Sequence, residues 1–295
     1  VQMRLCRFGS PTNEKPGIIL SDDEARIDVS GFGEDFDERF FGSEGISRLR
    51  AWLNEHVASC PRVSTSERIA PPLCRPSKIV CVGLNYRDHA AETNSELPKE
   101  PMLFGKATSA ICGAHDPIII PRGGLKTDWE VELAVVIGRR ANYVPLPQWR
   151  EYVAGYCIMN DVSERAFQKE RGGQFIKGKS ADSFAPLGPF VRSADEVVDP
   201  NSLALRLTVN GQTRQDGSTA AMIFNVPFLV SYISQFMTLL PGDIISTGTP
   251  AGVGAGCNPP QFLRHGDIVE YSVEGLGECR NEVVCYESHG SMTIS

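Results

Sequence analysis

The segment from Thr127 to Gly138 constrains the fold most, because it predicts a β-strand rich in Val, Leu and Ile with a polar start and a glycine at its end. Side chains alternate across a strand, so Glu130 and Glu132 point to the same face. Two neighbouring carboxylates on an apolar strand repel each other and lose hydration, so they need a cation, a shared proton or solvent. The segment therefore predicts either a solvent-facing strand end or a charged site.

Short apolar runs bounded by turn residues prevail in the rest of the chain. Helices are predicted over 43–57, 162–169 and 226–237, and a brief one at the end of 85–92. These runs do not alternate regularly with helices, which excludes a doubly wound sheet and favours a mainly-β α+β architecture. Residues 59–76 contain four prolines and predict a linker. We therefore expect a small β-rich N-terminal domain with its linker over residues 1–72 and a larger domain over 73–295.

The net charge and the hydropathy of the chain limit the kinds of partner that it is expected to bind. The formal net charge is −7 and the pI is about 5.4, without a basic stripe, which argues against nucleic acid. No apolar run approaches the roughly 18 to 20 residues that span a bilayer, and the first residues do not resemble a secretory signal. We expect a cytoplasmic protein that acts on a small molecule and has neither a nucleic-acid nor a membrane partner.

A third carboxylate follows the next predicted strand, 152–159. Asp161 there has two interpretations: it is the N-cap of a helix over 162–169, or it is a third ligand beside Glu130 and Glu132. A site built from three carboxylates offers only oxygen ligands, which favours Mg²⁺, Mn²⁺ or Ca²⁺ over zinc.

Other candidate residues have an ordinary and a functional interpretation each. His89 and Glu92 share a face if their segment is helical, as an exposed pair by chance or as a base oriented by a carboxylate. Lys179, in a glycine-rich stretch, is a surface lysine or a charge aimed at a substrate. The glycine-rich segment 248–254 lacks the Gly-Lys-Ser/Thr ending of a phosphate loop, which excludes a nucleotide role, although the Thr249 hydroxyl could bind an anion.

Taken together, six segments resemble the fumarylacetoacetate hydrolase family, in the family's own order and over roughly residues 75–285. They are 81–89 (Cys-Val-Gly-Leu-Asn-Tyr-Arg-Asp-His), 129–133 (Trp-Glu-Val-Glu-Leu), 160–165 (Asn-Asp-Val-Ser-Glu-Arg), 178–180 (Gly-Lys-Ser), 222–224 (Met-Ile-Phe) and 242–250 (Gly-Asp-Ile-Ile-Ser-Thr-Gly-Thr-Pro). The first 70 residues resemble, less specifically, the small N-terminal domain of some members.

The resemblance implies a mixed β-sandwich roll that assembles as a homodimer or higher oligomer and uses Mg²⁺ or Mn²⁺. The implied residues fall into three groups. They are the metal ligands Glu130, Glu132 and Asp161, the catalytic residues His89, Glu92 and Lys179, and the substrate contacts Arg165, Gln168 and Thr249.

The activity that the resemblance implies is Mg²⁺-dependent hydrolysis of the C3–C4 bond of a 2,4-diketo acid, giving pyruvate and a second acid. Segments 163–168 and 178–184 resemble members that act on 2,4-diketo-3-deoxy sugar acids of the rhamnonate or fuconate series. That subgroup is often labelled ureidoglycolate lyase, which is an alternative activity. Oxaloacetate decarboxylation, 2-hydroxydienoate isomerisation and a catalytically silent binding module are further alternatives.

Overall fold

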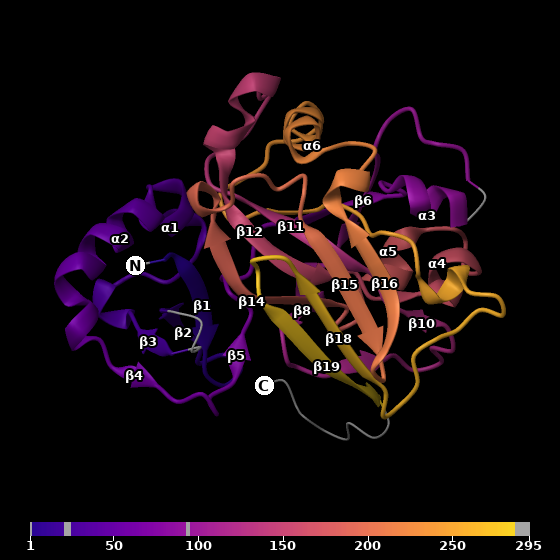
Figure 1. Ribbon diagram of the computed structural model, residues 1–295, viewed down its shortest axis with the longest axis horizontal. Coiled ribbons are helices and arrows are strands. Elements are labelled where there is room, and N and C mark those ends of the chain that lie inside the picture. The colour runs from indigo at the N-terminus through magenta and orange to yellow at the C-terminus, as the bar shows by residue number, and fades with distance from the viewer. Residues whose placement is uncertain (1, 21–24, 93–94, 287–295) are drawn as a thin grey trace.

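Two sheets of short strands form the framework of the computed structural model, which describes residues 2–20, 25–92 and 95–286 (Figure 1). Within these ranges the larger sheet has twelve strands. Ten follow in the order β4-β3-β2-β1-β14-β12-β11-β17-β6-β7, while β5 pairs with β1 and β8 with β14. The strands are β1 (Arg4–Phe8), β2 (Lys15–Ile19), β3 (Arg26–Asp28), β4 (Arg62–Val63), β5 (Ile69–Ala70), β6 (Ile79–Gly83), β7 (Met102–Lys106), β8 (Ile111–Gly113), β11 (Val131–Ile137), β12 (Val153–Asn160), β14 (Ala185–Ser193) and β17 (Ile244–Ser246).

The second sheet has five strands among the described residues, in the order β16-β15-β18-β19-β9. They are β9 (Ile118–Ile120), β15 (Ala204–Val209), β16 (Gln212–Ser218), β18 (Ile268–Val273) and β19 (Glu278–Cys285). β10 (Thr127–Asp128) and β13 (Ser163–Glu164) form a separate pair. Most neighbours run antiparallel, but β8–β14, β6–β17 and β9–β19 run parallel. The predicted mainly-β α+β class with mixed sheets is confirmed.

Helices are short and lie outside the sheets (Figure 1). They are α1 (Glu38–Gly42), α2 (Gly45–His56), α3 (Arg87–Glu92), α4 (Arg165–Lys169), α5 (Phe175–Lys179) and α6 (Val226–Ile233). The helix predicted over 43–57 is α2, and the one predicted over 226–237 is the shorter α6. α6 begins at the Asn225 N-cap, whose side chain accepts from the Phe228 amide. The helices α3, α4 and α5 lie at the end of the molecule farthest from the N-terminal strands.

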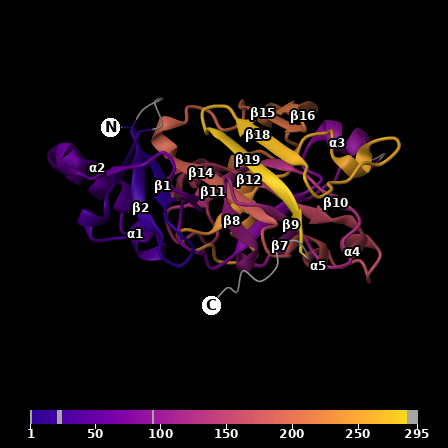
Figure 2. The same ribbon diagram turned by 90° about the horizontal axis from the view of Figure 1, so that it is seen from below.

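β11 is the most enclosed strand of the larger sheet. It pairs with β12 on one side and β17 on the other, and every residue in it is buried. It also contacts β15 and β18 of the second sheet, which lies against the larger sheet in Figure 2. The apolar side chains of β11 belong to a core cluster that extends from Met3 to Val283. A charged side chain on this strand is therefore surrounded by protein rather than by water.

The N-terminal strands continue the larger sheet, because β1 pairs with β14. The segment 59–76, predicted as a linker, carries β4 and β5, and β5 pairs with β1. Arg68 beside it forms an ion pair with Asp116, with Nη2 and Oδ2 2.6 Å apart. The division into domains at residue 72 stays a prediction.

β19 shows why some strands escaped sequence reasoning. Its buried positions alternate with charged ones, but one of them is Asn281, so the apolar pattern is broken. Asn281 accepts from the Tyr271 hydroxyl (2.7 Å) and donates to the carbonyls of Ala114 (3.2 Å) and Asp116 (2.7 Å). A polar residue that is satisfied only by distant partners cannot be identified as buried from its neighbours in sequence.

The helices of the described ranges include none with the length and apolar character needed to cross a membrane.

Asn85 joins three segments next to α3 and is fully buried. Its side-chain amide donates to the carbonyls of Phe224 (2.9 Å) and Thr247 (2.7 Å), and its carbonyl accepts from the Phe224 amide (2.8 Å). This side chain therefore fixes the loops after β6 and β17 against the segment before α6.

We expect Asn85→Ala to lower the free energy of unfolding by roughly 2–4 kcal/mol, because it removes three hydrogen bonds to backbone groups of Phe224 and Thr247 and leaves the buried Thr247 carbonyl without this partner. Urea unfolding followed by fluorescence measures the change. The exposed Asn54 on α2 provides the control, and its Ala variant should unfold like the wild type. Equal stabilities of the two variants would contradict the assignment.

Candidate active site

Three buried carboxylates meet at the start of β11. One oxygen from each of Glu130, Glu132 and Asp161 lies within 4.8 Å of the others, and the residues are 6%, 2% and 0% exposed. The Asp161 amide donates to the Glu130 carbonyl (2.8 Å), which extends the β11–β12 pairing and places Asp161 beside the glutamates. The solvent-facing interpretation of the pair is therefore wrong. Three oxygen donors at this spacing form a cluster of the kind that holds a divalent metal ion.

Two buried lysines lie against these carboxylates. Lys179 Nζ is 2.7 Å from both Glu130 Oε2 and Asp161 Oδ2, and the residue is 2% exposed. Lys106, at the end of β7, donates to Asp161 Oδ1 and to the Val162 carbonyl (3.0 Å). The interpretation of Lys179 as a surface lysine in a loop is wrong, since it is the last residue of α5 and is buried.

α4 and α5 position Lys179 through close packing. A Cβ at Gly178 would lie 2.6 Å from Gln168 Cβ and 2.7 Å from the Glu164 carbonyl oxygen, so only glycine allows this approach. α4 begins at Arg165, three residues later than predicted, and its N-cap is Glu164. The N-cap interpretation of Asp161 is therefore wrong, because the chain first forms β13 before turning into the helix.

The two glutamates have opposite electrostatic surroundings. Burial opposes the ionisation of Glu130, but Lys179 and Arg165 outweigh it and lower its pKa, with a smaller contribution from the charge of His89. Burial, together with the negative charges of Asp161 and Glu130, raises the pKa of Glu132 to about 8. Glu132 thus lacks enough positive charge nearby, although the Ser246 hydroxyl and the Gly248 amide (2.9 Å) donate to its Oε2.

The charge balance of the cluster leaves room for a cation. Four buried carboxylates face three buried cations, namely Asp128, Glu130, Glu132 and Asp161 against Lys106, Arg165 and Lys179. Two buried donors, the Tyr86 hydroxyl and the Asn160 amide nitrogen, have no hydrogen-bond partner in the described part of the chain. Burial and the charge of Glu132 raise the pKa of Tyr86, so its hydroxyl lies within electrostatic reach of the cluster. Such donors pair with ordered water or ligand oxygens, so these residues fit a hydrated divalent cation.

Arg165 connects Glu130 to a loop on the far side of the cluster. Its Nη2 lies 2.6 Å from Glu130 Oε1, its Nε 2.9 Å from Asp128 Oδ2 and its Nη1 3.2 Å from Gln168 Oε1. Asp128 in turn accepts from the amides of Gly254 (2.7 Å) and Ala255 (2.9 Å). In this structure Arg165 and Gln168 are therefore held by protein partners beside the carboxylates, and their contact with substrate stays a prediction.

His89 and Glu92 lie on α3, as predicted. His89 Nδ1 is 3.2 Å from Glu92 Oε2, and the other Glu92 oxygen accepts from the Gly252 amide (2.9 Å). A Cβ at Gly256 would lie 2.5 Å from the Glu92 carboxyl carbon, so the loop approaches Glu92 closely. Glu92 is thus fixed by the same loop that Asp128 holds, and it can fix the orientation of the imidazole.

Thr249 lies next to the carboxylates, but its hydroxyl is already bonded. It donates to the Val131 carbonyl (2.8 Å) and accepts from the Gln215 side chain (2.7 Å). Gly248 before it has a φ of +96°, and a Cβ there would lie 2.8 Å from Asn85 Cβ. This conformation aims the Gly248 amide at Glu132. The proposed contact of Thr249 with substrate stays a prediction that competes with these two bonds.

Sequence reasoning missed three residues of the cluster. Lys106 ends an unremarkable strand, Asp128 was considered only as a polar strand start, and Ser246 lies within an apolar run. Lys106 and Ser246 are each a buried polar residue at the last position of a strand of the larger sheet, and a polar residue at the end of an apolar strand is the signal that could have found them. Their partners are 55 and 114 residues away in sequence, so local pattern alone does not pair them.

Comparison with known proteins agrees with this architecture. Residues 78–284 match the family described as fumarylacetoacetate (FAA) hydrolase C-terminal. A putative hydrolase of Burkholderia multivorans is 50% identical over 277 residues, which cover 94% of this chain and 97% of the relative.

Three solved structures share the fold over 96% of this chain. A fumarylacetoacetate hydrolase from Exiguobacterium antarcticum is 35% identical (TM-score 0.83, 99% of that chain covered). Maleylpyruvate hydrolase from Sphingobium sp. SYK-6, solved with manganese(II) and pyruvate, is 28% identical (TM-score 0.80, 99% covered). A 2-hydroxyhepta-2,4-diene-1,7-dioate isomerase from Mycobacterium marinum is 34% identical (TM-score 0.74, 99% covered). The chain is therefore an enzyme of the fumarylacetoacetate hydrolase family, which groups hydrolases and isomerases on one fold.

Proposed function

We propose that the protein is a metal-dependent hydrolase that cleaves the C3–C4 bond of a 2,4-diketo acid. The observation that carries the proposal is the buried carboxylate triad of Glu130, Glu132 and Asp161 combined with a His–Glu dyad near it. When bound by the triad, a divalent cation would polarise the carbonyl oxygens of the substrate. Mg²⁺ is the cation that we propose for the cell, with Mn²⁺ as a substitute, since both prefer oxygen ligands.

His89 acts as the base in the proposed reaction, and Lys179 stabilises the negative charge that develops. Glu92 holds Nδ1 of His89, so Nε2 of the ring can take a proton from the water that attacks the C4 carbonyl. The C3–C4 bond then breaks, its electron pair stays with C3, and C3 takes up a proton to give pyruvate. The C4 fragment leaves as a carboxylic acid. Lys179, charged and buried between Glu130 and Asp161, stabilises negative charge on the substrate oxygens.

The substrate that we propose is a 2,4-diketo-3-deoxy sugar acid of the rhamnonate or fuconate series. The support comes from segments 163–168 and 178–184, which hold Arg165, Gln168 and Lys179 beside the triad. Maleylpyruvate hydrolase was solved with pyruvate, which is the product that our proposal requires. Ureidoglycolate lyase activity remains the alternative within the same subgroup.

An isomerase acting on a 2-hydroxydienoate is the second candidate, because a solved isomerase is 34% identical to this chain. Isomerisation and oxaloacetate decarboxylation need no attacking water, so neither needs His89 to activate one. A catalytically silent binding module is disfavoured, since the triad, the dyad and Lys179 are all present and Lys179 is paired with Glu130 of the triad. A cytoplasmic location and assembly into a homodimer or higher oligomer stay part of the proposal.

Replacing one triad carboxylate tests the metal site directly. We expect Glu132→Gln to weaken binding of Mn²⁺ by on the order of 100-fold, because it removes a ligand and its charge. Isothermal titration calorimetry of the metal-free protein with Mn²⁺ alone gives the affinity. Glu55→Gln on the exposed face of α2 removes the same charge and should bind like the wild type. Indistinguishable affinities of the two variants would place the metal elsewhere.

The reaction class is tested with a substrate panel. The purified enzyme with Mg²⁺ should release pyruvate from a 2,4-diketo-3-deoxy sugar acid, and a coupled lactate dehydrogenase assay detects it. Ureidoglycolate, oxaloacetate and a 2-hydroxydienoate serve as the competing substrates. The hydrolase proposal fails if no diketo acid of the panel yields pyruvate while one of the other substrates turns over.

His89 separates hydrolysis from the two reactions that need no attacking water. We expect His89→Ala to lower kcat for the diketo acid by roughly 10²–10⁴-fold, because the general base is lost, while Mn²⁺ affinity stays unchanged. His265→Ala removes an exposed histidine away from α3 and should leave kcat unaltered. Full activity of His89→Ala on the native substrate would favour isomerase or decarboxylase chemistry.

A further inference from the structure

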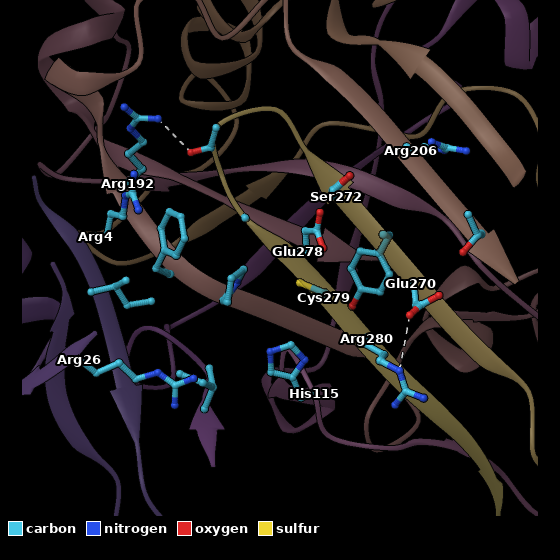
Figure 3. Close-up of a pocket in the computed structure, with 18 of the residues that line it drawn as sticks. Arg4, Arg26, His115, Arg192, Arg206, Glu270, Ser272, Glu278, Cys279 and Arg280 are labelled. Carbon is cyan, nitrogen blue, oxygen red and sulfur yellow. Dashed lines mark hydrogen bonds and ion pairs between the residues drawn. The ribbon is translucent and has the colours of Figure 1, made fainter. Parts of the chain in front are cut away.

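A cavity lies apart from the carboxylate cluster, where the N-terminal strands meet β18 and β19 (Figure 3). Its volume is about 910 Å³, within the range of roughly 300–1,000 Å³ that small-molecule sites occupy. Neither the triad, the dyad nor Lys179 lines it. The cavity is therefore separate from the site to which we assign catalysis.

The charge of this cavity is opposite to that of the protein as a whole. Its lining contains five arginines and two glutamates, which gives 5 − 2 = +3 without the histidine, whereas the chain carries −7. The arginines come from five different strands, and Figure 3 shows them on both sides of the cavity. They are Arg4, Arg26, Arg192, Arg206 and Arg280, and the glutamates are Glu270 and Glu278. Five strands thus each contribute one arginine to the lining of this cavity.

Two of these guanidinium groups are incompletely bonded. Nε of Arg26 and Nε of Arg192 are buried and have no hydrogen-bond partner among the described residues. Arg26 is 7% exposed and uses Nη1 for the Glu67 carbonyl (3.0 Å). Arg192 Nε lies 3.8 Å from Glu196 Oε2, which is too far for a hydrogen bond. A buried charged donor without a hydrogen bond lowers the stability of the fold. We therefore expect each of these two nitrogens to bind a partner such as an anion or water.

The arginines on the opposite side have only weak partners within the protein. Arg206 is exposed and donates to the Thr213 hydroxyl (2.9 Å). Arg280 Nε lies 3.6 Å from Glu270 Oε1, with both side chains at least half exposed. Surface pairs of this kind contribute little, so an anion can displace Glu270 at small cost.

We propose that this cavity binds a small polyanion with two or more carboxylate or phosphate groups. Guanidinium groups bind both kinds of oxyanion in a bidentate manner, and the arrangement on two sides matches a ligand charged at both ends. A second copy of the chain is a poorer occupant. A two-fold contact would place the same surface, with its charge of +3, against itself. The proposal is independent of the reaction at the triad.

Isothermal titration calorimetry at low salt tests the proposal, with tricarballylate as the polycarboxylate, fructose 1,6-bisphosphate as the phosphate ester and acetate as the singly charged control. We expect at least one polyanion to bind with a 1:1 ratio, more tightly than acetate and more weakly as salt increases. The double substitution Arg206→Gln and Arg280→Gln should weaken binding by on the order of tenfold or more. Both residues are exposed, so the fold should tolerate the change.

Two matched variants complete the design. Arg264→Gln removes an exposed arginine outside the cavity, and Glu132→Gln alters the triad, and neither should change polyanion binding. The proposal is overturned if the wild type binds neither probe, or if Glu132→Gln abolishes binding while the arginine pair does not. It is also overturned if the wild type binds nothing and sedimentation shows that the arginine pair holds two copies together.

Discussion

The structure depends on the burial of negative charge at the start of β11. Glu130, Glu132 and Asp161 are nearly inaccessible to water, and ionised carboxylates in such surroundings are unstable without compensating charge. Lys179 satisfies Glu130 and Asp161, and Arg165 adds a second cation to Glu130. Glu132 accepts hydrogen bonds from two neutral donors, the Ser246 hydroxyl and the Gly248 amide. Its negative charge is therefore the least compensated of the three.

The residues that compensate this negative charge also hold the surrounding loops in place. Arg165 reaches Asp128, and Asp128 holds the amides of the loop that also fixes Glu92. Glu92 in turn holds the ring of His89. The loop 252–255, which is hydrogen-bonded to Asp128 and to Glu92, thus connects the carboxylate cluster to the histidine on α3. The positions of the base and of the cation site therefore depend on one connected set of polar residues.

The sequence was sufficient to predict the Glu130 strand, the strand before Asp161 and the helix of His89, because each has a regular local pattern. It could not decide whether Glu130 and Glu132 are buried, since that depends on β12, β17 and the second sheet covering β11. Lys106 and Asp128 went unassigned for the same reason, as their partners are distant in sequence. Asn281 shows the limit most clearly, because a buried asparagine looks like an exposed one until its partners are known.

A crystal structure of the protein grown with Mn²⁺ tests the central claim most directly. Anomalous scattering locates manganese independently of the protein atoms. The account predicts one strong anomalous peak within coordination distance of Glu130, Glu132 and Asp161, with the Lys179 ammonium moved away from at least one of its two carboxylates. A map without a peak among these three carboxylates, at a metal concentration that supports activity, would contradict the account.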